Sequence, residues 1–121
     1  MTLRTGIDLI EIDRVRDLLE RYGPRFLGRV FTPQEIAEVG ENVASLAGRF
    51  AVKEAVAKAL GTGIGRVAWR EIEIVRGPQR EPVLRLHGTA ARLSNELGLH
   101  EWSVSISHSQ THVVGLAVAQ G

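Results

Sequence analysis

The chain has 121 residues, contains no cysteine and carries a formal net charge of +1. This size is typical of one domain, residues 1–121, and the missing cysteines exclude disulfides, thiolate zinc sites and a cysteine nucleophile. Near-neutral charge argues against a nucleic-acid partner, and the absence of a signal-peptide core or a membrane-length apolar run predicts a soluble, cytoplasmic protein.

The first half of the chain predicts one strand followed by helices. Residues 3–12 alternate between two faces, and one of these faces carries the carboxylate of Asp8. Apolar residues at helical spacing predict a helix over residues 13–22. The segment FTPQE, with a threonine N-cap and a glutamate three residues later, starts a second helix over residues 32–40. A third helix is predicted over residues 44–60.

The second half changes to the alternating period of strands. Residues 70–76 and 82–88 flank a turn-rich segment and predict a β-hairpin. A short helix over residues 89–98 and a strictly alternating strand over residues 102–109 follow. The last strand, residues 112–120, is apolar on both faces, which is typical of an interior strand or one covered by another subunit. Helices in the first half of the chain and antiparallel pairs of strands in the second half predict an α+β fold, in which an antiparallel sheet packs with helices.

Charged residues interrupt the otherwise apolar segment AGRFAVKEAVAKALGTGIG. Glu54 and Lys58 lie one helical turn apart, the spacing of an ordinary surface ion pair. Asp8 adds a carboxylate within an apolar strand, and such a group is costly to bury unless it is paired or bound to a metal. Hard cations such as Mg²⁺ take one or two carboxylates together with substrate phosphates. A structural ion pair and an enzyme site for a pyrophosphate are both open interpretations of these residues.

Arginines are concentrated in and just after the first predicted helix. Five of them lie between residues 13 and 29, against three acidic residues. A solvated helix face is the usual meaning of such a run. An acidic helical partner explains it better, because arginine binds carboxylates in pairs and steers association. Sparse aromatic residues argue against RNA as that partner.

The segments GIDLIEIDR, FTPQE, LAGRFAVKEAVAKALGTGIG and SVSISHS occur in the order and approximate spacing of the holo-acyl-carrier-protein synthases. The chain resembles this family of short 4'-phosphopantetheinyl transferases over essentially its whole length. The resemblance implies transfer of phosphopantetheine from coenzyme A to a serine of acyl carrier protein, with Mg²⁺ as cofactor. It also implies a role in fatty acid biosynthesis, with polyketide carriers as a further option, and a homotrimer with its sites at subunit interfaces.

The resemblance further implies roles for individual residues. Asp8 and Glu54 match the protein ligands of Mg²⁺, and Lys58 matches a lysine that steadies phosphate charge on the leaving adenosine 3',5'-bisphosphate. Either Glu54 or a metal-bound water is the base for the carrier serine. The implied coenzyme A contacts are Arg49, Lys53, Lys58, Gly61, Thr62, Gly63, Ile64, Ser107 and His108, the last delivered from a neighbouring subunit. The implied carrier-protein contacts are Arg14, Leu18, Arg21, Arg25, Phe26 and Arg29, of which Leu18 fits the core equally well.

A small non-enzymatic binding module is the alternative interpretation. Its arginine-rich first helix would bind an acidic protein partner, and Glu54 with Lys58 would be a structural ion pair. Metal dependence distinguishes the two interpretations. Asp8→Ala or Glu54→Ala should abolish the activity of an enzyme, whereas a binding module should still bind its partner.

Overall fold

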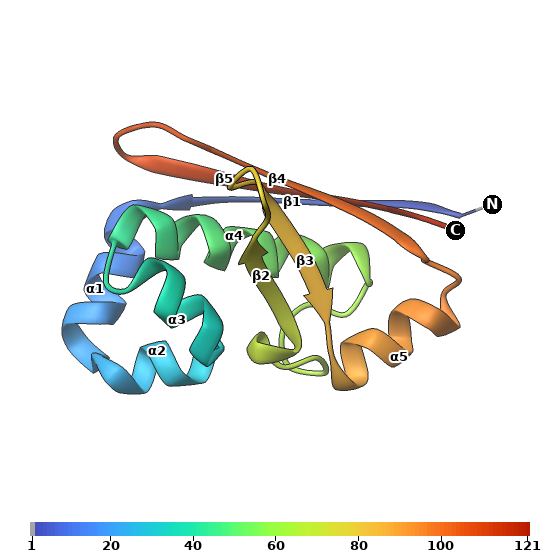
Figure 1. The fold of residues 1–121 in the computed structure, drawn as a ribbon, viewed down its shortest axis with the longest axis horizontal. Coiled ribbons are helices and arrows are strands. Elements are labelled where there is room, and N and C mark those ends of the chain that lie inside the picture. The colour runs from blue at the N-terminus through green and yellow to red at the C-terminus, as the bar shows by residue number, and fades with distance from the viewer. Residues whose placement is uncertain (1) are drawn as a thin grey trace.

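A computed structural model describes residues 2–121. The elements follow one another as β1 (Leu3–Glu11), α1 (Ile12–Tyr22), α2 (Pro24–Val30), α3 (Pro33–Val39), α4 (Val43–Ala59), η1 (Trp69–Glu71), β2 (Ile72–Arg76), β3 (Pro82–Leu86), α5 (Gly88–Glu96), β4 (Glu101–His108) and β5 (His112–Gln120). Figure 1 shows a sheet with α4 lying along one face and the remaining helices beyond it on the same side. No helix among residues 2–121 combines the length and apolarity needed to cross a membrane.

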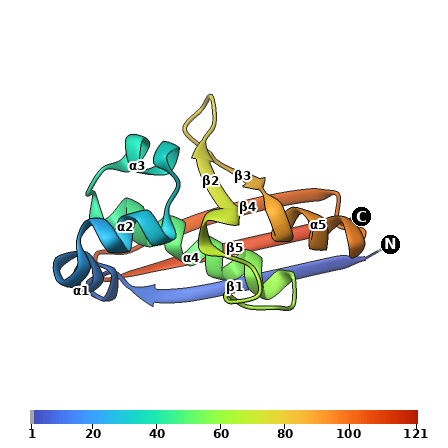
Figure 2. The ribbon, with the colours of Figure 1, turned by 90° about the horizontal axis from the view of Figure 1, so that it is seen from below.

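The main sheet has three antiparallel strands in the order β1-β5-β4. β5 is therefore the central strand, which confirms the prediction from its apolar faces. β2 and β3 form a separate antiparallel hairpin, as the sequence predicts. In Figure 2 β1 and β4 lie at opposite edges of the main sheet, and the hairpin stands between α1–α3 and α5. The α+β fold is confirmed.

Helix α4 packs unusually close to the sheet because glycines face it. A Cβ added to Gly6 on β1 would lie 1.8 Å from the Ala55 carbonyl oxygen, and one on Gly115 of β5 would lie 2.5 Å from the backbone nitrogen of Val52. Between residues 46 and 59 of this helix, only Glu54 and Lys58 are not buried. The helix therefore exposes charge at one place only, beside β1.

Aromatic packing joins the first three helices to α4. The rings of Phe26 and Phe31 meet edge to face with centroids 5.9 Å apart, and Phe50 stacks on Trp69 at 4.7 Å. Buried side chains from α1, α2, α3 and α4 complete this cluster. A second cluster lies between α4, the β2–β3 hairpin and α5. The two clusters fix α4 between the sheet and the rest of the chain.

Helix α2 was not predicted. The Gly23–Pro24 pair was interpreted only as the end of the first helix, and Gly23 does end α1 with a positive φ of 51°. Pro24, however, also occupies the first turn of α2, where its missing N–H costs nothing. The predicted capping box at Thr32 and Glu35 is confirmed at the start of α3.

Candidate active site

The first half of the candidate site lies where α4 meets β1. β1 directs Asp8 towards the helix, on the face that it shares with Gly6 and Ile10. The Lys58 ammonium donates to Asp8 Oδ1 at 3.1 Å and to the Ile7 carbonyl oxygen at 2.9 Å. The structure therefore brings together a carboxylate from β1 and a lysine from α4, as the enzyme interpretation requires.

Glu54 lies near this pair, one turn earlier on α4. Burial raises the pKa of the Glu54 carboxyl, and the negative charge of Asp8 raises it further. Arg14 and Lys58 act in the opposite direction but do not cancel these effects. The Glu54 carboxyl thus lies near the negative charge of Asp8 in a partly buried place, and a bound cation would relieve this repulsion.

One oxygen of Asp8 is the most informative atom of this half-site. Asp8 Oδ2 is buried and has no hydrogen-bond donor among residues 2–121. A buried acceptor without a partner is costly, and a carboxylate oxygen more so. No group of three or more acidic, histidine or cysteine side chains gathers within the described chain. Asp8 and Glu54 therefore fit a hard cation whose remaining ligands come from water and substrate phosphates.

The glycine-rich loop continues directly from α4. Gly61 and Gly63 have positive φ values of 82° and 65°, and the N–H groups of Thr62 and Gly63 both donate to the Ala57 carbonyl oxygen at 3.2 Å. Arg4 of β1 donates to the Ala59 carbonyl oxygen at 3.3 Å beside this loop. The loop thus follows the end of α4 that carries Lys58. Arg4 is a basic residue that the sequence interpretation did not single out.

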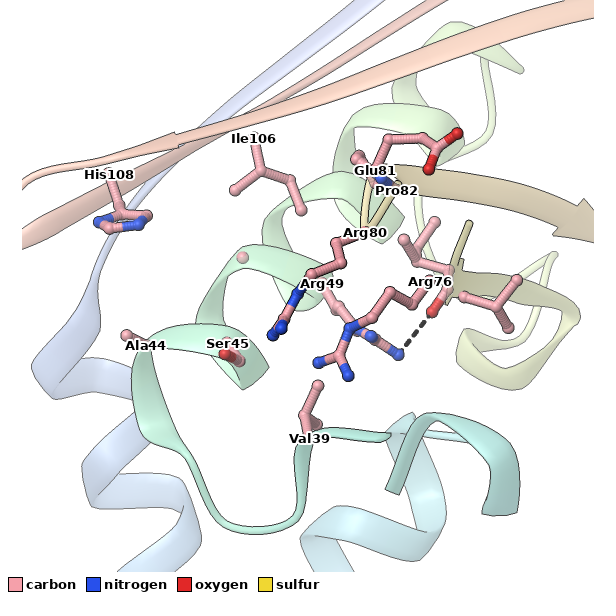
Figure 3. A pocket seen from close by; sticks show the side chains of 13 residues that line it. Val39, Ala44, Ser45, Arg49, Arg76, Arg80, Glu81, Pro82, Ile106 and His108 are labelled. Carbon is pink, nitrogen blue, oxygen red and sulfur yellow. Dashed lines mark hydrogen bonds between the residues drawn. The ribbon is translucent and has the colours of Figure 1, made fainter. Parts of the chain in front are cut away.

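The second half of the candidate site is a cavity at the other edge of the sheet. It has a volume of about 330 Å³ and lies between α4, the β2–β3 hairpin and the end of β4 (Figure 3). Arg49, Arg76, Arg80 and His108 line it. Arg49 donates to the Ile74 carbonyl oxygen at 2.7 Å and forms an ion pair with Glu38 at 2.9 Å. Sequence analysis found Arg49 and His108 but missed the two hairpin arginines.

Lys53 requires a correction. Its side chain is fully buried, and its ammonium donates to Glu35 Oε1 at 2.8 Å, to the Ile72 carbonyl oxygen at 2.7 Å and to the Trp69 carbonyl oxygen at 3.1 Å. Burial lowers the pKa of Lys53, and the charge of Glu35 partly offsets this effect. Every donor direction is used inside the protein, so Lys53 does not face coenzyme A as the resemblance implies.

A single chain does not bring all the predicted coenzyme A contacts together. Asp8 and Lys58 lie at the β1 edge of the sheet, whereas Arg49 and His108 lie at the β4 edge, with β5 between them. Ser107 lies one residue from His108 on β4, so its side chain points to the opposite face of the sheet. The candidate site is therefore two half-sites on opposite edges of one sheet.

The predicted carrier surface lies on α1 and α2. Its arginines are all exposed: Arg14, Arg21, Arg25 and Arg29. Leu18 is half-buried, and Phe26 is buried in the core but still contributes to a shallow hollow with Leu18, Tyr22 and two of the arginines. Arg14 lies over the Phe50 ring and its charge reaches Glu54. The arginine-rich surface thus adjoins the first half-site.

Comparison with known proteins identifies the class. Residues 4–117 match the family model of the 4'-phosphopantetheinyl transferase superfamily. The chain is 49% identical to the holo-acyl-carrier-protein synthase of Herpetosiphon aurantiacus over 98% of this chain and 99% of the relative. It is 46% identical to the same enzyme of Moorella thermoacetica over 98% of this chain and 94% of the relative.

A solved structure agrees with these relatives. The crystal structure of Helicobacter pylori holo-acyl-carrier-protein synthase in complex with coenzyme A has a TM-score of 0.88 and 32% identity, covering 96% of this chain and 99% of that chain. The chain is therefore a transferase that belongs to the 4'-phosphopantetheinyl transferase superfamily. Within that superfamily it groups with the holo-acyl-carrier-protein synthases, which confirms the resemblance stated from the sequence.

Proposed function

We propose that this chain transfers the 4'-phosphopantetheine group of coenzyme A to a serine of apo acyl carrier protein, in fatty acid biosynthesis. The products are the holo carrier and adenosine 3',5'-bisphosphate. Asp8 Oδ2, which is buried and finds no donor within the described residues 2–121, carries this proposal. Beside Glu54 and Lys58 it marks a place suited to a cation and phosphate charge. The relatives named above support it, and one of them was solved with coenzyme A.

The metal assignment follows from the same atoms. Asp8 and Glu54 would hold Mg²⁺ through their carboxylate oxygens. When bound, the ion would neutralise pyrophosphate charge and help to orient the reacting phosphate. Lys58 is half-exposed and already held against Asp8, so its ammonium is available to the phosphate that leaves with the nucleotide.

The transfer step needs one proton acceptor. The hydroxyl oxygen of the carrier serine forms a bond to the phosphorus that bears pantetheine, and the bond from that phosphorus to the bridging oxygen of the nucleotide phosphate breaks. Glu54 accepts the serine proton, because its partly buried carboxylate lies near Asp8 and Lys58, where the reacting phosphate would be held. A water molecule at the same place is the alternative acceptor.

A second copy of the chain would complete the site. One face of the main sheet carries no helix (Figure 1), and Leu3, Ile7, Leu9 and Leu116 are 66%, 60%, 64% and 37% exposed there. Ile7 pairs directly with Leu116 across β1 and β5, and Leu9 follows Ile7 on the same face, so these three side chains form one apolar patch. Exposed apolar patches of this kind mark protein interfaces. Packing of further copies on this face, as a homotrimer, would join the β1 half-site of one subunit to the β4 half-site of its neighbour.

The test is mass spectrometry of apo acyl carrier protein after incubation with this protein, coenzyme A and Mg²⁺. The proposal predicts a mass gain of one phosphopantetheine that disappears with a chelator and with Asp8→Ala or Glu54→Ala. Arg92→Ala removes one exposed charge on α5, outside both half-sites, and should keep full transfer. No mass gain from folded protein on several carriers would reject the enzyme proposal in favour of a binding module.

A further inference from the structure

A guanidinium group attaches the end of α4 to β1. Arg4 lies on the face of β1 that also carries Gly6 and Asp8, so its side chain is directed towards α4. Its Nη1 donates to the Ala59 carbonyl oxygen at 3.3 Å. Figure 1 shows α4 ending beside the N-terminal half of β1, where this contact forms. Arg4 takes part in none of the ion pairs formed within residues 2–121, so a helix carbonyl and not a carboxylate holds the guanidinium.

The Ala59 carbonyl oxygen is an acceptor that the helix cannot satisfy itself. The last four carbonyl groups of a helix have no N–H partner one turn later. The loop after α4 turns back on the carbonyl oxygens of Ala57 and Lys58 and so passes over that of Ala59. Ala59 is only 1% exposed, and a buried carbonyl group without a donor is costly. Arg4 supplies this donor, and its charge also suits the negative end of the helix dipole.

The glycine-rich loop rests on the same guanidinium group. Gly61 and Gly63 have positive φ values, and glycine gives a loop little stiffness of its own. A Cβ added to Gly61 would lie 3.2 Å from Arg4 Nη1. Arg4 therefore contacts the last turn of α4 and lies against the first residue of the loop. The arrangement of the loop depends on this contact from another element.

The contact also bears on Lys58, which directly precedes Ala59. The Lys58 ammonium reaches from the helix to Asp8 on β1 at 3.1 Å, whereas Arg4 reaches from β1 to the helix. Between these two contacts, a Cβ on Gly6 would lie 3.0 Å from the Ala59 backbone nitrogen, so strand and helix touch through their backbones. The direction of the Lys58 side chain is thus fixed by a last turn that β1 holds on both sides.

We propose that Arg4 is a positioning residue, which holds the end of α4 on β1 and so keeps Lys58 and the glycine-rich loop in the arrangement that binds coenzyme A. The inference rests on the proposed function, under which Lys58 and this loop contact coenzyme A. Arg4 acts through them and is assigned no contact with the substrate. A displacement of about 1 Å in such positioning groups can lower a rate about 100-fold, so one hydrogen bond behind the site matters.

Three variants separate the roles of Arg4. Arg4→Met keeps an apolar stem but has no donor for the Ala59 carbonyl oxygen. Arg4→Lys keeps a cationic donor on a flexible stem, so it should restore part of what Arg4→Met loses. Arg92→Met is the matched control, because Arg92 is an exposed arginine of α5 that also donates to a neutral oxygen, Thr89 Oγ1, at 3.0 Å.

The first measurement is amide hydrogen exchange of the full chain by NMR, without metal or substrate. The Thr62 and Gly63 amides donate to the Ala57 carbonyl oxygen at the end of α4. In Arg4→Met they should exchange about tenfold faster than in the wild type, while the amides of β5 keep their rates. Arg4→Lys should lie between the two, and Arg92→Met should match the wild type. Unchanged exchange of the loop amides in Arg4→Met would overturn the proposal.

The second measurement is calorimetric titration by coenzyme A with Mg²⁺, with steady-state kinetics beside it. Arg4→Met should lower the affinity for coenzyme A about tenfold, as for one lost charge-assisted hydrogen bond, and raise KM for coenzyme A but not for the carrier. A residue with a merely structural role would change the unfolding midpoint and leave this affinity and KM unchanged, which would overturn the proposal. An equal loss of affinity in Arg92→Met would overturn it too.

The two proposals fail in distinguishable ways. Neither hydrogen exchange nor titration requires transfer. Coenzyme A binding that depends on Arg4, in a protein without transferase activity, would reject the proposed function and keep the role of Arg4. A wild type that transfers phosphopantetheine, with an Arg4→Met variant of unchanged affinity, would reject the role of Arg4 alone. A wild type that does not bind coenzyme A would overturn both.

Discussion

Replacing Lys53 with methionine should destabilise the fold severely and leave coenzyme A affinity of the folded protein unchanged. Lys53 and Glu35 are both fully buried, and the lysine also satisfies the Trp69 and Ile72 carbonyl oxygens. Methionine fills similar space but leaves the Glu35 carboxylate without its counter-charge. Removing one partner of such a pair costs about 3–5 kcal/mol.

Urea unfolding followed by circular dichroism measures this loss. With a slope of about 2 kcal/mol per molar urea, a loss of about 4 kcal/mol lowers the midpoint by about 2 M. The double variant Lys53→Met/Glu35→Gln removes both charges. It keeps one oxygen acceptor, whereas the Thr32 and Ile74 N–H groups donate to different oxygens of Glu35, so it should recover only about half of the loss. Lys58→Met, on the exposed face of the same helix, should change stability by less than about 1 kcal/mol.

The opposite pattern would refute the reasoning. Suppose that the free energy of unfolding of Lys53→Met falls by less than about 1 kcal/mol, as for a surface ion pair, and that the variant binds coenzyme A weakly. Lys53 would then be a coenzyme A contact after all. A double variant no more stable than the single one would show that the charge on Glu35 is not the source of the loss.

Three further outcomes follow from the structure. Asp8→Asn should abolish transfer and lower the pKa of Glu54. It should lower the free energy of unfolding of the metal-free protein by no more than about 1 kcal/mol, because the Lys58 partner of Asp8 is half-exposed. Activity assays, carboxyl titration by NMR and urea unfolding check these outcomes. Burial alone would raise the pKa of Glu73, but hydrogen bonds with Thr32 and His87 hold it below its usual value of about 4.5. The contribution of the Glu73 carboxylate to the free energy of unfolding is therefore present above pH 4.5 and lost as the pH falls through the lowered pKa. The free energy of unfolding should consequently fall less steeply with acid in Glu73→Gln than in the wild type. Leu116→Lys on the bare sheet face should shift the molar mass measured by light scattering to that of a single chain and remove transfer; an unchanged mass would place the interface elsewhere.

The sequence predicted the elements that hold the first half-site. Alternation along β1 placed Asp8 with Gly6 and Ile10, and this face packs on α4. The helical spacing of Glu54 and Lys58 put both on one stripe, and the structure leaves this stripe as the exposed part of an otherwise buried segment. Local periodicity was sufficient to predict this half-site because the face to which each side chain points depends only on its own helix or strand.

The remaining features depend on contacts between distant segments. Lys53 was assigned to the ligand because nothing near it in sequence reveals Glu35, which arrives from α3 with its own capping role. The positive φ of Arg80 depends on turn closure between Gly77 and Glu81, which the residue letters alone do not reveal. The separation of the half-sites follows from β5 pairing between β1 and β4, although β5 is the last strand in the chain.

Subunit complementation tests the central claim most directly, because the proposed reaction needs a β1 half-site and a β4 half-site from different copies. Asp8→Ala disables the first half-site, and His108→Glu, at an exposed position in the cavity, disables the second. Each variant alone should fail to load acyl carrier protein. After the two are mixed and allowed to exchange subunits, some interfaces join an intact Asp8 to an intact His108, so transfer should return. Mixtures that exchange subunits but remain inactive would contradict the account.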